Sequence, residues 1–132
     1  MLMTKTITLQ LIRAGAILLL SFATIVSART GGSLTPDEAV HHIGEKVEVC
    51  GVVASAKYST KSRGQPTFLN LGRAYPKHIF TALIWGSDRS RFDYAPEALQ
   101  GQKICVKGTI TTYRGKPQII VSNPSQIHIP TE

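Results

Sequence analysis

Five segments with strand-like patterning, separated by polar or glycine-containing turns, occupy residues 46–130. The first, KVEVCGVVASAKY at 46–58, alternates valines with more polar positions, and Gly51 predicts a bend within it. A period of two is typical of a strand that buries one face. The other four segments are TFLNLG (67–72), HIFTALIW (78–85), KICVKGTITTY (103–113) and PQIIVSNPSQIHI (117–129). This pattern predicts one all-β domain over residues 46–130.

Two stretches outside the strands carry helix signals. Residues 35–38, TPDE, combine an N-cap threonine, a proline at the first helical position and a glutamate three residues after the cap. Gly44 is a typical helix stop. We therefore expect a leader and a short helix, at about 36–43, within residues 29–45. Residues 86–101 lack strand alternation, and their later part predicts a helical connection between the third and fourth strands.

Residues 1–28 have the composition of a secretory signal peptide. Lys5 and Arg13 precede the apolar run AILLLSFATIV, and small residues end at Ala28, where cleavage is expected. The alternative is an uncleaved membrane anchor, but the run is shorter than the ~20 residues that span a bilayer. The sequence therefore predicts a bacterial protein of the periplasm or the medium, with no membrane span after cleavage.

The charge of the chain indicates a class of partner, and its two cysteines indicate a disulfide. The chain has a net charge of +7, and removing Lys5 and Arg13 with the predicted signal peptide leaves +5. A basic balance favours polyanionic partners, either nucleic acid or an anionic surface. Export favours a disulfide between the two cysteines, Cys50 and Cys105. No Cys-x-x-Cys pair supports redox exchange, so a structural role is expected for this bond.

Four short motifs lie within the predicted strands and turns: GVV at 51–53, FLNLG at 68–72, VKGTI at 106–110 and YRGKPQI at 113–119. With the order of five strands and one helical connection, they resemble OB-fold nucleic-acid-binding domains, including the anticodon-binding type and small exported bacterial OB proteins. The resemblance implies a five-stranded Greek-key barrel. The alternative is an all-β sandwich of similar size. Such motifs support a fold better than a function.

Strand parity makes Phe68 and Asn70 candidate ligand contacts. Leu69 and Leu71 share one face of the second strand, so Phe68 and Asn70 face outward if the leucines fill the core. In OB-fold domains similar to this one, an aromatic at this place stacks on a base and the polar residue two positions on bonds to its edge. Stacking contributes ~1–3 kcal/mol per base. The alternative is that the N-terminal helix or the long connection covers Phe68.

Two predicted loops repeat a tyrosine followed by two cations. They hold Tyr58, Lys61 and Arg63 after the first strand, and Tyr113, Arg114 and Lys116 between the fourth and fifth. In an OB-fold these loops flank the ligand face, so the resemblance implies that the cations meet phosphates and the tyrosines offer stacking surfaces. Arg73 and Lys77 extend this basic surface. The alternative is that the loops are basic for solubility and the tyrosines pack across hairpins.

Strands one and four pair in an OB-fold, so the resemblance places Cys50 and Cys105 opposite each other, pointing outward. The third strand is apolar on both faces, so its buried face stays open. We expect Trp85 to close one end of the domain.

No catalytic residue, metal site or cofactor is predicted. His41 and His42 are adjacent and would diverge by about 100° on a helix, and His78 and His128 are isolated in sequence. The Asp and Arg residues at 88–93 are interpreted as a solvated, salt-bridged surface, because a hydrolase needs a positioned acid, base or metal set.

The predicted function is a non-enzymatic, exported OB-fold module that binds single-stranded DNA or RNA with little sequence preference. The first alternative is a periplasmic OB-fold protein that binds a protein, a small ligand or an envelope component in the same groove. An accessory nuclease is the second alternative.

Overall fold

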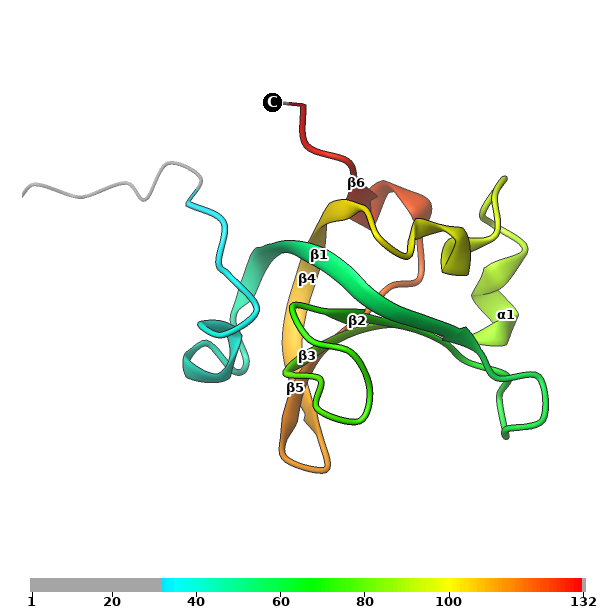
Figure 1. Cartoon of the computed structure of the whole chain (residues 1–132), viewed down its shortest axis with the longest axis horizontal. Helices are drawn as coiled ribbons and strands as arrows, with labels where there is room; N and C mark the ends of the chain where they lie inside the picture. Colours follow the sequence, from blue (N-terminus) through cyan, green and yellow to red (C-terminus); the bar gives the residue numbers. More distant parts are fainter. Residues whose placement is uncertain (1–31, 132) are drawn as a thin grey trace, which may run out of the picture.

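The computed structural model describes residues 32–131, and its strands dominate (Figure 1). The strands are β1 (Lys46–Tyr58), β2 (Thr67–Leu71), β3 (Phe80–Ile84), β4 (Lys103–Tyr113), β5 (Lys116–Ile120) and β6 (Ile127–His128). The helical pieces are η1 (Ala39–His41), α1 (Gly86–Arg89), η2 (Pro96–Leu99) and η3 (Pro124–Gln126). The predicted all-β class is confirmed. The predicted signal peptide, residues 1–28, lies outside the described residues.

The strands form a sheet that closes on itself. Neighbours follow the order β1-β2-β3-β5-β4, and β1 pairs again with β4, so the sheet rings round. The long, curved β1 pairs with β4 over 46–52 and with β2 over 53–58 (Figure 1). The register shifts between Val53 and Ser55, just where β1 changes partner, rather than at Gly51. This order is consistent with an OB-like fold.

The core lies inside this ring. Leu69 and Leu71 are fully buried, as the parity of β2 predicts. On β3, the fully buried set on that inner face is Phe80, Ala82 and Ile84, which settles the face that the sequence left open. Phe92 and Leu99, from the connection between β3 and β4, complete the core cluster.

The N-terminal segment contains less helix than expected. A turn leads into the single 3-10 turn η1, where a helix over 36–43 was predicted. Glu38 reaches back as expected, because its carboxylate accepts from the N–H of Thr35 at 3.3 Å and from its hydroxyl at 2.9 Å. Leu34 pairs with Val49 and bonds to the backbone of β1 on either side. The chain before β1 is therefore held against the sheet.

The end of the chain also differs from expectation. The predicted fifth strand, 117–129, divides into β5, a turn through η3, and β6, which pairs with β4 at Cys105 and Val106. The side chains of Asn123 and Gln126 form a capping box around that turn. Within residues 32–131 no helix is both long and apolar enough to cross a membrane.

Candidate nucleic-acid interface

The outward face of β2, β3 and β5 carries a row of apolar side chains. Phe68 lies opposite Leu83, and Leu83 lies opposite Ile120. The row is continued on β1 by Lys57, which lies opposite Phe68 and is exposed. Leu83 is buried, Phe68 is half-buried and Ile120 is 41% exposed. An apolar strip therefore crosses three adjacent strands and ends at a cation on β1.

A polar row runs beside the apolar one, and it satisfies its own hydrogen bonds. Asn70 is only 4% exposed. Its amide nitrogen donates to the hydroxyl of Ser55 at 3.0 Å, and its amide oxygen accepts from the hydroxyl of Thr81 at 2.8 Å. Both partners lie directly opposite Asn70 on the neighbouring strands. The expectation that Asn70 bonds to the edge of a base is corrected: these bonds and its burial tie it to the sheet.

The loop between β2 and β3, residues 72–79, extends over this polar row. The N–H of Tyr75 donates to the Ser55 hydroxyl at 3.0 Å, and Lys116 donates from its ammonium to the carbonyl of Pro76 at 3.1 Å. Tyr75 stacks on His78, with ring centroids 5.6 Å apart. Burial, with a smaller contribution from Lys116, lowers the pKa of His78, which favours the neutral ring. The loop thus lies beside the turn between β4 and β5 (Figure 1).

Acidic residues are missing from the stretches of chain that build this face. No Asp or Glu occurs between 49 and 87 or between 98 and 131. The first of these stretches contains five cations: Lys57, Lys61, Arg63, Arg73 and Lys77. Within residues 32–131 the lysines and arginines that form ion pairs are Arg89, Arg91 and Lys107, none of which lies in that stretch. The spacing of the acids along the sequence could have revealed these acid-free stretches.

The two tyrosine-containing loops differ in structure. Tyr113 is 58% exposed and lies opposite Lys116, on the same face as the polar row. The Arg114 guanidinium lies 5.3 Å from the centre of its ring. The β4–β5 turn therefore presents an accessible aromatic beside Arg114 and Lys116.

Tyr58 lies in a different environment. It is opposite Thr67 on β2, one residue along from the Lys57–Phe68 pair and so on the other face of the sheet. The guanidinium carbon of Arg89 lies 3.8 Å from the centre of the Tyr58 ring. This expectation is therefore corrected as well, because one face of the ring is occupied and Tyr58 does not join Phe68. Lys61 and Arg63, in the loop that follows, are exposed.

Arg89 is held in a structural network rather than on a solvated surface, which corrects the sequence interpretation. Its guanidinium donates to both carboxylate oxygens of Glu97 at 2.7 Å and to the hydroxyl of Thr67 at 2.9 Å. The hydrogen bond from Arg89 lowers the pKa of Glu97. The network fastens the connection after β3 to the start of β2. Beside it, Trp85 packs close to Gly64, and the N–H of Gly86 donates to the carbonyl of Gly64 at 2.9 Å, so Trp85 supports the β1–β2 loop.

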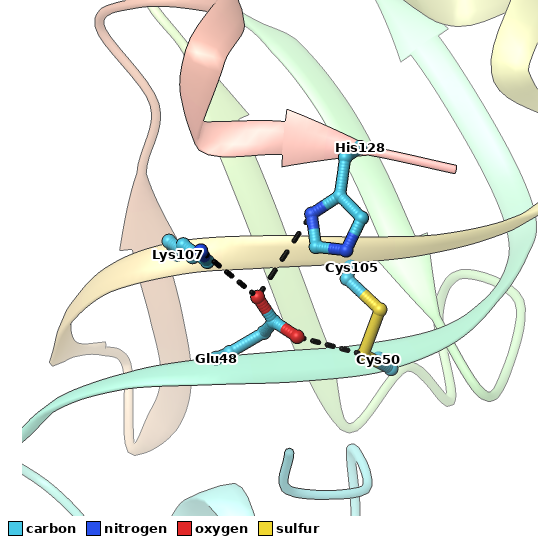
Figure 2. The surroundings of a disulfide bond; sticks show 5 residues. All are labelled: Glu48, Cys50, Cys105, Lys107 and His128. Atoms are coloured by element: carbon cyan, nitrogen blue, oxygen red, sulfur yellow. Dashed lines mark hydrogen bonds and ion pairs between the residues drawn. A yellow bond between two sulfur atoms is a disulfide. The ribbon is translucent and has the colours of Figure 1, made fainter. Parts of the chain in front are cut away.

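The predicted disulfide is present. Cys50 and Cys105 are directly opposite on β1 and β4, with Cα atoms 4.0 Å apart and an S–S bond of 2.00 Å. Figure 2 shows Glu48, Lys107 and His128 around this bond. Glu48 forms ion pairs with Lys107 at 3.6 Å and, when the imidazole is protonated, with His128 at 3.8 Å. A disulfide of this kind is consistent with an oxidising compartment.

Comparison with known proteins identifies remote structural likenesses only. No protein-family model matches the sequence, and no curated protein matches it. Among solved structures, the chain is similar to OBody AM1L10 bound to hen egg-white lysozyme, with 16% identity, a TM-score of 0.48, and coverage of 76% of this chain and 94% of that one. It is also similar to OBody AM2EP06 bound to hen egg-white lysozyme, with 14% identity, a TM-score of 0.46, and coverage of 73% and 90%.

A third likeness is to a structure described as an aspartyl-tRNA synthetase from Leishmania major Friedlin. Here the identity is 12%, the TM-score is 0.47, and the match covers 76% of this chain but only 21% of the synthetase. These likenesses are too remote to assign a family or an activity.

Proposed function

We propose that this protein is a non-enzymatic, exported OB-fold module that binds single-stranded nucleic acid with little sequence preference. The observation that carries the proposal is the apolar strip on the outward face of β2, β3 and β5, together with the stretches 49–87 and 98–131, which hold cations and no acid. Phosphates would contact exposed cations, and bases would lie on the apolar strip. Such a combination of basic groove and stacking surface is typical of proteins that bind single strands.

The positions of the side chains suggest a division of roles. Phe68 and Tyr113 offer aromatic surface, and the cations proposed to meet phosphates are Lys57, Lys61, Arg63, Arg114 and Lys116, of which all but the half-buried Lys116 are exposed. Tyr58 has no part in this proposal, because Arg89 covers one face of its ring. Asn70 has none either, because its amide bonds within the sheet.

The polar row also bears on sequence preference. Base identity is read mainly through hydrogen bonds to base edges, whereas stacking is tolerant of sequence. Ser55, Asn70 and Thr81, the polar groups nearest Phe68 on the outward face, bond to one another. Weak discrimination among bases is therefore expected of this surface.

The test is a fluorescence-anisotropy titration of the oxidised chain, lacking residues 1–28, with labelled homopolymeric DNA and RNA strands at several salt concentrations. Contacts with four or five phosphates predict a slope of about −3 in log K against log salt. Val52→Ala is the matched control for Phe68→Ala, since Val52 is an exposed apolar residue paired with β4 instead of β2. Intact strands after incubation with Mg²⁺ would exclude the nuclease alternative.

Absence of binding at low salt would refute the proposal. It would favour the alternative in which the same face binds a protein, a small ligand or an envelope component. An affinity that does not change with salt concentration would refute the role of the cations, whether the binding is weak or strong.

A further inference from the structure

The disulfide lies within a group of side chains that could ligate a metal once its sulfurs are free. Cys50, Cys105 and His128 are directly opposite one another on β1, β4 and β6. Glu48 lies two residues before Cys50 and so shares its face of β1. Figure 2 shows all four side chains converging on one patch. The sequence alone left His128 isolated, because the pairing that brings it to Cys105 is a tertiary contact.

The donor atoms are already close together. One carboxylate oxygen of Glu48 lies 3.7 Å from Cys50 Sγ, and the other lies 3.8 Å from His128 Nδ1. The ligand atoms of Glu48, Cys50 and Cys105 all lie within 4.8 Å of one another. A tetrahedral zinc ion holds nitrogen, oxygen and sulfur ligands at about 2.0–2.3 Å, so neighbouring ligand atoms are separated by roughly 3.3–3.8 Å. The two bonded sulfurs are thus the atoms that must separate.

We propose that reduction of the Cys50–Cys105 disulfide creates a zinc site whose ligands are the two cysteines, His128 and Glu48. A dithiol reductant supplies two electrons and two protons, so it becomes a disulfide while the S–S bond yields two thiols. Zinc then displaces both thiol protons to solvent and binds the thiolates. The zinc ion would then cross-link β1 to β4 in place of the disulfide.

The chemistry of the patch suits zinc. Two thiolates select soft or borderline ions, and a set of two sulfurs, one imidazole and one carboxylate fits tetrahedral zinc better than calcium or magnesium. The zinc ion, two thiolates and one carboxylate would carry a net charge of −1, which Lys107 beside Glu48 offsets. His128 is 46% exposed and Glu48 26% exposed, so an ion can reach the patch from solvent.

The experiment uses the chain without residues 1–28, reduced with a dithiol and freed of that reductant without oxygen. Cobalt(II) is the spectroscopic probe. The reduced chain is expected to bind one equivalent, with a thiolate-to-cobalt charge-transfer band and the intense visible bands of tetrahedral cobalt, and zinc should displace it. The oxidised chain should show neither band.

Variants separate a four-ligand site from simple thiol binding. His128→Gln and Glu48→Gln should each weaken zinc binding at least about tenfold in competition with a chromophoric chelator. Lys103→Gln is the matched control, because Lys103 lies on the same face of β4 two residues from Cys105, and it should leave the affinity unchanged. Unchanged affinity in both His128→Gln and Glu48→Gln would overturn the proposal, as would the lack of a charge-transfer band in the reduced chain.

Far-ultraviolet circular dichroism accompanies each titration. If the reduced chain unfolds without metal, one equivalent of zinc is expected to restore the spectrum of the oxidised chain. Failure to restore it would also overturn the proposal. Nucleic-acid binding by the oxidised chain is independent of this site, so the two proposals succeed or fail separately.

Discussion

Replacing Arg89 tests how the connection after β3 is fastened to the sheet. The change Arg89→Met retains aliphatic volume but removes two bonds to Glu97, one bond to the buried hydroxyl of Thr67, and the contact with the Tyr58 ring. Hydrogen bonds to charged groups contribute ~1.5–3 kcal/mol net, whereas exposed ion pairs contribute ~0.2–1 kcal/mol. The Arg89 and Glu97 side chains are 20% and 32% exposed, so the pair lies between these cases.

We therefore expect Arg89→Met to lower the free energy of unfolding by about 2 kcal/mol and Tm by roughly 10 °C. Urea unfolding of the oxidised protein, followed by Trp85 fluorescence, measures the change. A double-mutant cycle with Glu97→Gln should give a coupling of about 1–2 kcal/mol at pH 7. A coupling near zero would refute the inference that this ion pair holds the connection in place.

The pH dependence of that coupling provides a second check. The Arg89 bond holds the pKa of Glu97 below its ordinary value near 4.5. A carboxylate with a lowered folded-state pKa stabilises the protein above its unfolded-state pKa, and this stabilisation is lost as pH falls through the folded-state pKa. The coupling should therefore persist from pH 7 to about pH 5 and fade toward pH 3. A coupling that is the same at pH 7 and pH 3 would contradict the assignment.

Three further changes test other parts of the molecule. Phe68→Ala should weaken binding of single-stranded DNA by ~1–3 kcal/mol in the anisotropy assay, and an unchanged affinity would remove Phe68 from the interface. Joint replacement of Cys50 and Cys105 by alanine should cost about 4 kcal/mol for a loop of 55 residues, measured by thermal unfolding; a loss under 1 kcal/mol would refute the staple role. Gly108→Ala should cost ~1–3 kcal/mol in urea unfolding, because its Cβ would lie 2.6 Å from a methyl of buried Ile119, and full stability would show that this contact relaxes.

Strand positions could be predicted where the sequence pattern depends only on residues close together along the chain. The predicted first and fourth strands, 46–58 and 103–113, have the bounds of β1 and β4. Each combines alternating apolar residues with clear turn residues, and both signals depend only on near neighbours. The same locality explains why Leu69 and Leu71 could be assigned to the core.

The N-terminal helix shows where local signals are overridden. Leu34 is tied to β1, and the N–H of Gly44 bonds to the carbonyl of Ile110 on β4 at 2.7 Å. With both ends of the segment bonded to the sheet, only a turn and the single 3-10 turn η1 form between them. The start signals around Glu38 remain correct, although the predicted length is wrong.

Local patterns in the sequence were enough to place the first four strands, the inward leucines of β2, the disulfide between Cys50 and Cys105 and an outward Phe68. Which of the candidate side chains are free to meet a ligand depends on contacts that form in the folded chain. Arg89 reaches Tyr58 from a later connection, and Asn70 finds partners on two other strands. The period of a strand assigns each residue to one face, whereas the accessibility of its side chain depends on partners remote along the chain.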